Sequence, residues 1–115
     1  MKSDIAVAAL SALAQDSRLA IYRLLVKRGP DGYAAGEIAA RLDLPAPTLS
    51  FHLKALAQAK LVEVRRSGRF LHYRANFRRM NELVAYLTEN CCSGGSATDP
   101  CCEPSPSLPQ RRARA

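Results

Sequence analysis

The sequence predicts one mainly α-helical domain that also contains a small β element (α+β), in the order α-α-α-α-β-β-α. Three observations support this fold class. The chain has 115 residues, which suits a single domain, since compact domains typically contain about 100–150 residues. Apolar residues recur at helical spacing before residue 60 and again after residue 76. Two alternating segments, residues 61–65 and 70–74, flank a Ser-Gly turn and predict a β-hairpin.

We expect the domain to span residues 1–90 and a flexible tail to span residues 91–115. The tail contains four of the seven prolines, several glycines and serines, and no apolar periodicity. It also contains all four cysteines. Most of the positive charge lies in the domain, which has 14 Lys and Arg against 8 Asp and Glu.

Charge and composition limit the function classes. The formal net charge of +7 favours nucleic acid as a partner and, second, an anionic membrane surface. The length excludes a two-lobed enzyme with a deep cleft. We expect no membrane span, because no apolar run reaches about 18–20 residues. The first ten residues lack the apolar core and cleavage site of a signal peptide. We therefore expect cytoplasmic localisation, where thiols stay reduced.

The first two predicted helices are joined near residue 15. Ser3 or Asp4 is expected to cap the first helix, which runs to about Ala14. Asp16 is expected to cap the second helix, from residue 17 to about residue 27, and Gly29-Pro30 ends it. The dense apolar residues of the second helix predict a central, buried element. The inward face of the first helix is expected to carry Ile5, Ala9, Leu10 and Leu13.

Two more helices follow, joined by a short turn. The third spans about Ala35 to Leu42, with Ile38, Ala39 and Leu42 inward. The fourth begins near Pro45, since Pro is well tolerated at a helix start, and runs to about Ala59. Its inner stripe repeats at i, i+4 and i+7, and its flanks and outer face carry polar residues and one Phe. The stripe is Leu49, Leu53 and Leu56, and the outward set is Thr48, Ser50, Phe51, His52 and Lys54.

The hairpin and one further helix complete the domain. Asn76 is expected to cap the last helix, which runs to about Asn90 with Met80, Leu83, Val84 and Leu87 inward. Four helices, a hairpin and a final helix are the elements of a winged helix-turn-helix. In such folds the second helix of the helix-turn-helix enters the major groove of DNA.

The candidate DNA-binding residues lie on the fourth helix and the hairpin. Hydroxyl groups can bond phosphates or base edges, and Lys54 can neutralise a phosphate. Three guanidinium groups at the turn favour phosphate or minor-groove contact, although charged runs are usually only a solvated face. An exposed Phe51 can contact a thymine methyl or pack on the neighbouring helix. The full set is Thr48, Ser50, Phe51, His52, Lys54, Arg65, Arg66 and Arg69. His52 and His72 are isolated, and a lone His is more often structural than a metal ligand.

Three segments resemble the ArsR/SmtB family of metal-sensing repressors. They are ALAQDSRLAIYRLL (12–25), TLSFHLKALAQAKLV (48–62) and RRSGRFLHYR (65–74), and the resemblance covers about residues 4–90. It implies a homodimer built by the first and last helices, with double-stranded operator DNA as partner and no cofactor required for DNA binding. It also implies nucleoid association when bound to DNA, and release when an inducing metal or metalloid binds.

The sequence departs from the family pattern at four places. Pro45 stands where the family often has a capping Ser, and Phe51 stands where it has a polar or basic residue. Residues 36–40 lack the cysteine box of the third helix. Residues 81–89 lack the Asp and His ligands that zinc sensors carry on the last helix. An effector site is therefore expected elsewhere.

The four cysteines form two adjacent pairs, Cys91-Cys92 and Cys101-Cys102, separated by eight residues. Adjacent α-carbons lie about 3.8 Å apart, below the usual disulfide range, so a vicinal disulfide is disfavoured. Adjacent residues diverge by about 100° on a helix, so the helix must fray for both thiols to face one ion. Thiolate-only sites select soft ions.

Trivalent arsenic or antimony, As(III) or Sb(III), is the predicted inducer. Each forms three bonds in a pyramid, which Cys91, Cys92 and one of Cys101 or Cys102 supply. Arsenic-responsive members of the resembled family carry a similar Cys-Cys…Cys site after the last helix.

Several other interpretations of the cysteines stay open. They are a zinc or cadmium site that uses all four, a thiol redox switch, and cysteines without a ligand role. A metal-stapled structural DNA-binding protein is a further alternative. A small cysteine-dependent reductase is disfavoured, because Cys91 follows a helix C-terminus and not the N-terminus that stabilises a thiolate. The sequence therefore predicts a regulator and not an enzyme.

Overall fold

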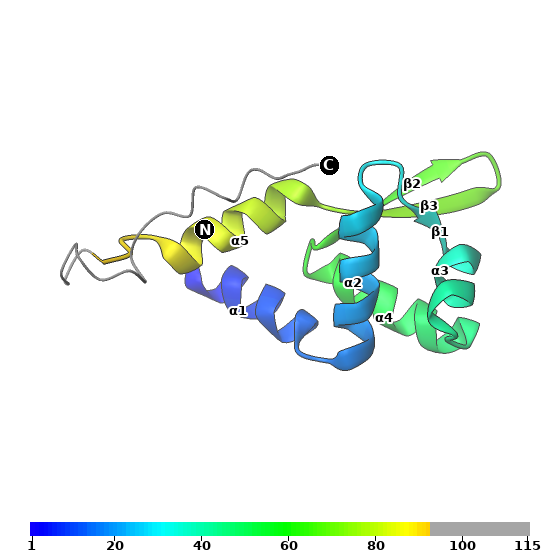
Figure 1. Cartoon of the computed structure of the whole chain (residues 1–115), viewed down its shortest axis with the longest axis horizontal. Coiled ribbons are helices and arrows are strands. Elements are labelled where there is room, and N and C mark those ends of the chain that lie inside the picture. Colours follow the sequence, from blue (N-terminus) through cyan, green and yellow to red (C-terminus); the bar gives the residue numbers. More distant parts are fainter. Residues whose placement is uncertain (93–115) are drawn as a thin grey trace.

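The computed structural model describes residues 1–92 (Figure 1). This part of the chain forms five helices and three strands and confirms the predicted winged helix-turn-helix class. The predicted tail beyond residue 92 lies outside the described residues. The helices are α1 (Ser3–Leu13), α2 (Asp16–Arg28), α3 (Ala35–Leu42), α4 (Ala46–Gln58) and α5 (Phe77–Thr88), and the strands are β1 (Tyr33–Ala34), β2 (Val62–Ser67) and β3 (Phe70–Ala75).

The sheet is antiparallel and has the order β1-β3-β2. The sequence predicts two strands, and β1 is an addition to that expectation. Its two residues pair with β3, so that Tyr33 lies opposite Tyr73 and Ala34 opposite His72. Two residues are too few to show an alternating pattern, so this strand has no local signal in the sequence.

The predicted hairpin is formed by β2 and β3, with its turn at Gly68-Arg69. Ser67 pairs with Phe70, which shifts the two-residue turn by one position from the expected Ser-Gly. Gly68 has φ +63°, a conformation that glycine adopts without steric cost. A glycine of this kind at the first turn position suits the twist of the two strands.

The core lies between α2, α4 and the sheet. The predicted inner stripe of α4 is confirmed, because Leu49, Leu53 and Leu56 are all buried. The expectation that the second helix is central is also confirmed, since one whole side of α2 is buried. Its buried side chains are Ile21, Tyr22 and Leu25, which share the core with Ile38 of α3 and Leu61 before β2.

One of the predicted helix caps is confirmed and two are wrong. The Asn76 Oδ1 accepts a hydrogen bond from the Arg79 N–H at 3.2 Å, as expected for the start of α5. At α2 the cap is Gln15 and not Asp16, because its Oε1 accepts from the Arg18 N–H at 2.9 Å. At α1 neither Ser3 nor Asp4 is the cap: both already lie within the helix, and the flanking Lys2 has no capping side chain.

The packing of α1 and α5 differs from the prediction. Ala6, Ala9 and Ala12 form the buried face of α1, whereas Ile5 and Leu10 are exposed. On α5, Leu83 is buried as expected and Met80 is partly buried. Val84 and Leu87 are exposed, at 55% and 58%. The small alanines allow α1 to approach its neighbours closely, and a single chain leaves several larger apolar side chains of both helices in solvent. The two helices lie side by side at one end of the molecule (Figure 1).

Among the helices in residues 1–92, none combines the length and the hydropathy that a bilayer crossing requires.

Candidate nucleic-acid interface and thiol pair

The helix-turn-helix consists of α3 and α4, which pack against each other. The connecting turn passes through Asp43, whose φ is +54°. The Leu44 N–H then donates to the Ala39 carbonyl oxygen at 3.0 Å, which closes the end of α3. Pro47 lies in the first turn of α4, where a missing N–H costs little. The turn thus sets α4 with its leucine stripe inward and its opposite face in solvent.

Four of the five predicted residues on α4 lie on that outer face. Thr48, Ser50, Phe51 and Lys54 are exposed. Phe51 is 64% exposed. Its ring lies edge-on to the neighbouring His52, with centroids 5.5 Å apart, and the Arg18 guanidinium lies 6.0 Å from its centre. Of the two interpretations of Phe51, the structure favours an outward side chain over one packed into the adjacent helix.

Of the two predicted positions for His52, the flank or the outer face of the helix, the structure contradicts the outer face. Its side chain is only 7% exposed, and its Nδ1 accepts a hydrogen bond from the Arg18 Nε–H at 3.3 Å. The reason is its position, since residue 52 lies three residues after Leu49 and four before Leu56, next to the inner stripe. His52 therefore belongs to the support of α4 and not to its exposed surface. That support extends to Arg18, which no sequence pattern singled out.

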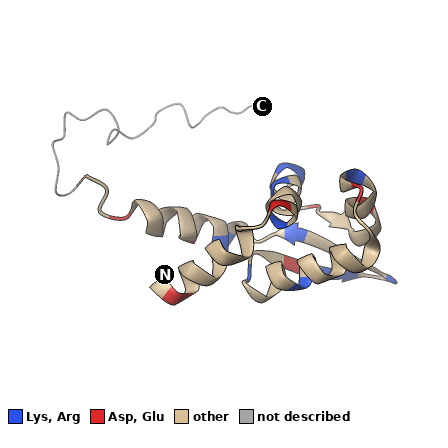
Figure 2. Cartoon of the chain, turned by 90° about the horizontal axis from the view of Figure 1, so that it is seen from below, with Lys and Arg blue, Asp and Glu red and all other residues tan. Residues whose placement is uncertain are grey.

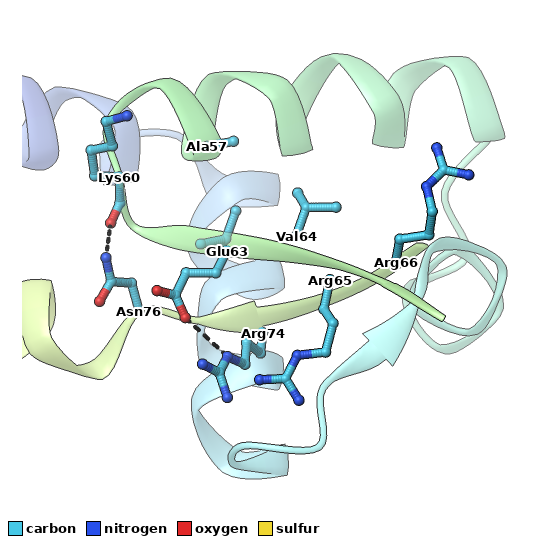
Figure 3. Close-up of a pocket in the computed structure, with 9 residues that line it drawn as sticks. Ala57, Lys60, Glu63, Val64, Arg65, Arg66, Arg74 and Asn76 are labelled. Atoms are coloured by element: carbon cyan, nitrogen blue, oxygen red, sulfur yellow. Dashed lines mark hydrogen bonds and ion pairs between the residues drawn. The ribbon is translucent and has the colours of Figure 1, made fainter. Parts of the chain in front are cut away.

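The three hairpin arginines are exposed but do not share one face. Arg65 and Arg66 are consecutive on β2, so their side chains point to opposite sides of the hairpin. Figure 3 shows Arg66 beside Val64 on the side of α4, and Arg65 on the other side near Arg74. Of the three arginines, Arg69 is the one that lies in the turn. The three predicted charges therefore do not form one cluster: they lie on both sides of the hairpin and at its turn.

A cross-strand ion pair joins β2 and β3 at the end of the hairpin away from its turn. The Arg74 Nε donates to the Glu63 Oε1 at 2.9 Å, between directly opposed residues of β3 and β2 (Figure 3). Both side chains are partly exposed, so the pair contributes at most about 1 kcal/mol to stability. This pair was not predicted from the sequence, although a Glu and an Arg at opposed positions of a hairpin could have indicated it. Glu63 lowers the net positive charge on the Arg65 side of the hairpin.

Positive charge is unevenly distributed over the fold. Figure 2 shows Lys and Arg mainly in the part that contains the sheet and α2 to α4, while α1 and most of α5 lack them. The α1 segment contains no Lys or Arg, and both arginines of α5, Arg78 and Arg79, lie in its first turn. The molecule thus has a basic end with the helix-turn-helix and hairpin, and an apolar end with α1 and α5.

The first cysteine pair follows the end of α5 directly. The helix ends at Thr88, two residues before the expected end, and Asn90 and Cys92 adopt positive φ values of 59° and 66°. Because the chain leaves the helix before the cysteines, the Sγ atoms of Cys91 and Cys92 approach to 3.3 Å. Cys91 is exposed and free.

Only half of the predicted thiol site can be placed. Cys101 and Cys102 lie outside the described residues. Within residues 1–92, no group of three or more His, Cys, Asp or Glu side chains is arranged to hold a metal ion.

Comparisons with known proteins agree on the class of fold. A model of a helix-turn-helix domain family matches residues 13–65. The transcriptional repressor SdpR of Bacillus subtilis (strain 168) is 30% identical over 76 residues, which is 66% of this chain and 81% of that protein. An ArsR-like transcriptional regulator from Rhodococcus sp. RHA1 is similar in structure, with a TM-score of 0.66 and 28% identity over 73% of this chain and 76% of that one.

A second similar solved structure is that of a homodimer. It is the homodimeric winged helix-turn-helix DNA-binding domain of a possible ArsR-family transcriptional regulator from Mycobacterium bovis. The TM-score is 0.60 and the identity 32%, over 76% of this chain and 81% of that domain.

Proposed function

Because this chain belongs to the ArsR family of winged helix-turn-helix transcriptional regulators, we propose that it is a homodimeric repressor that As(III) or Sb(III) releases from operator DNA. The observation that carries the inducer assignment is the close approach of the Cys91 and Cys92 sulfur atoms after α5, followed by a second cysteine pair nine residues after Cys92.

The outer face of α4 is the proposed surface for base contacts. Its hydroxyl groups and Lys54 can bond base edges and phosphates, and Phe51 presents an apolar ring to the groove. The hairpin arginines, exposed on both sides of the wing, contact the flanking backbone or minor groove. In a symmetric dimer, two copies of α4 read half-sites that lie about 34 Å apart, one turn of DNA.

The proposed dimer interface is the apolar end of the molecule. Val7 and Leu10 of α1 and Val84 and Leu87 of α5 are exposed large apolar side chains on two helices that contact each other. A groove of about 420 Å³ between α2 and α5 has Val84 on its wall and continues this surface. Covering such a surface is favourable by about 25 cal/mol per Å² of apolar area removed from water. The homodimeric relative from Mycobacterium bovis supports the dimeric state.

The geometry of the thiol pair supports a three-coordinate ion. Two sulfurs 3.3 Å apart, each at a metal–thiolate distance of about 2.3 Å, subtend about 90° at the ion. This angle suits a pyramid of three thiolates better than a tetrahedron of four. Cys91 and Cys92, reduced and deprotonated, would supply two ligands, and Cys101 or Cys102 the third.

The position of Cys91 and Cys92 suggests how an ion bound to them changes the affinity for DNA. Cys91 and Cys92 follow α5, and α5 contacts α1 in the proposed interface. Drawing the tail toward the end of α5 changes the packing of these two helices and, through the dimer, the relative position of the two α4 helices. A coupling free energy of about 1–3 kcal/mol is typical for such effects and weakens DNA binding about 5–150-fold.

The composition of the site is tested by arsenic stoichiometry and X-ray absorption on the wild type and on each single Cys→Ser variant. We expect one arsenic per protomer with three sulfur neighbours, and loss of that coordination in C91S and C92S. Four sulfurs around zinc or cadmium, with no arsenic bound, would support the tetrahedral alternative. Thiol oxidation without binding of any ion would support the redox switch.

A further inference from the structure

Arg18 is a half-buried arginine in the first turn of α2 that lies against α4. Its Nε–H donates to the Nδ1 of the buried His52 at 3.3 Å. Its guanidinium carbon lies 6.0 Å from the centre of the Phe51 ring, which is 64% exposed. Arg18 therefore brings a positive charge from α2 to the border of the outer face of α4.

Within residues 1–92, the remaining donors of this guanidinium have no carboxylate partner. Both ion pairs of residues 1–92 involve other arginines, Arg74 and Arg79. An arginine has five N–H donors, and the bond to His52 uses only the one on Nε. The Nη groups are left to bond an anion, and guanidinium groups suit phosphate oxygens geometrically.

The imidazole of His52 fixes the direction of the guanidinium. To accept from Arg18, its Nδ1 must carry the lone pair, so the proton of the neutral ring is on Nε2. A buried acceptor of this kind restricts the rotamers of a long side chain before any ligand arrives, which reduces the entropy lost on binding.

We propose that Arg18 contacts a DNA phosphate at the edge of the major groove that α4 enters. His52 is the positioning residue that orients the Arg18 guanidinium. This inference rests on the proposed DNA-binding function. It adds a residue of α2 to the interface and gives His52 a role that its burial would otherwise hide. The competing interpretation is that Arg18 only ties α2 to α4.

Salt dependence separates these two roles. Each phosphate contact contributes about 0.9 to the slope of log affinity against log salt, so a dimer that loses two contacts loses about 1.8. The probe is a labelled duplex of about 30 bp that the wild-type protein enriches from a randomised pool, long enough for two half-sites. Arg18→Met removes the charge and keeps the apolar stem, and Arg18→Lys keeps the charge.

We expect R18M to bind more weakly at low salt and to reduce the slope by about 1.8, while R18K retains most of it. The deficit of R18M relative to the wild type then shrinks about 12-fold between 50 and 200 mM salt. The matched control is Arg23→Met on the same helix, because Arg23 is exposed on the side of α2 that borders the apolar groove and not on the side of α4. Both variants are compared at protein concentrations at which light scattering shows them to be dimers, and R23M then leaves the slope unchanged.

The positioning role is tested with two substitutions of His52. His52→Asn keeps an acceptor close to the position of Nδ1, and His52→Leu removes it at similar volume. We expect H52N to retain the wild-type slope and H52L to match R18M. The free energy of unfolding is measured in parallel, and if H52L does not fold, the comparison of R18M with R23M still decides whether Arg18 contacts phosphate.

Two results overturn the inference while leaving the proposed function intact: R18M with the wild-type slope, or H52N and H52L with equal slopes. If the wild type itself binds the duplex without salt dependence, the proposed function fails and not merely the role of Arg18.

Discussion

Gly32 lies directly against the carbonyl oxygen of Tyr73, where the turn after α2 meets β3. A Cβ on Gly32 would overlap that oxygen and also approach the side chain of Arg74. Gly32 has φ +67° and lies next to Tyr33, which pairs with Tyr73. The short strand β1 can join the sheet only because this glycine lets two backbones come so close.

Replacing Gly32 by Ala is therefore expected to destabilise the fold. The left-handed conformation costs an L-residue about 1–2 kcal/mol, and the overlap is with backbone, which cannot rotate away. We expect the free energy of unfolding, measured by urea denaturation, to fall by more than about 2 kcal/mol.

The matched control is Gly36→Ala in α3, where a Cβ meets nothing within 4 Å. Alanine is the better helix former, so this change is expected to stabilise by up to about 1 kcal/mol. Equal effects of the two substitutions would show that the approach of Gly32 to Tyr73 is not a constraint.

Tyr22 provides a second test of the core. Its hydroxyl is buried and has no hydrogen-bond partner within the described part of the chain, and burial raises the pKa of Tyr22 above its usual value of 10.0. The native state thus holds this proton more tightly than the unfolded state. The resulting stability is complete below pH about 10 and is lost as the pH rises through the native pKa.

We expect Tyr22→Phe to be neutral or stabilising by up to about 1 kcal/mol at pH 7, because it removes an unpaired buried polar group. Between pH 9 and about 10.5 the variant should lose less stability than the wild type. A clear destabilisation at pH 7 with unchanged alkaline behaviour would mean that the hydroxyl has a partner in solution.

How much the sequence could predict depends on the range of each signal. The inner stripe of α4 repeats within one helix, so Leu49, Leu53 and Leu56 were identifiable. His52 lies at the border of that stripe, and its hydrogen bond comes from Arg18, 34 residues earlier in the chain. No local pattern encodes such a contact.

The prediction that Leu10, Val84 and Leu87 face inward failed for a different reason. The helical spacing of α1 and α5 marks Leu10, Val84 and Leu87 as residues to be covered, but it does not say by which chain. In a single chain they are exposed. The pattern is therefore consistent with the proposed dimer, in which they are covered by a second copy.

The dimer interface is tested by Val84→Glu and Leu87→Glu. Both residues are exposed in one chain, so the folded monomer should tolerate the change, whereas a charge inside an apolar interface is costly. We expect the dimer dissociation constant to rise at least about tenfold in size-exclusion chromatography with light scattering.

Phe70→Glu is the control for this experiment, because Phe70 is equally exposed but lies at the hairpin. It should leave the protein dimeric. A wild type that stays monomeric would contradict the proposed dimer. Glutamate variants that remain dimers would place the interface elsewhere.

Phe51 is expected to read a thymine methyl group. The outward ring offers apolar contact, and losing contact with one methyl costs about 0.8 kcal/mol, or roughly fourfold in affinity. Replacing thymine by deoxyuridine at the contacted position should weaken binding of the wild type but not of Phe51→Ala. Both proteins should have equal stability and equal salt slopes. If deoxyuridine affects the two proteins alike, Phe51 does not contact that base.

The central claim is that thiols at the end of α5 control DNA binding. It is tested most directly by the affinity for the selected duplex, measured by fluorescence anisotropy with and without arsenite, for the wild type and the Cys91→Ser, Cys92→Ser double variant. We predict that arsenite weakens wild-type binding about 5–150-fold and leaves the double variant bound at the affinity of the arsenite-free wild type. Release of the double variant by arsenite, or an unchanged affinity of the wild type, would contradict the claim.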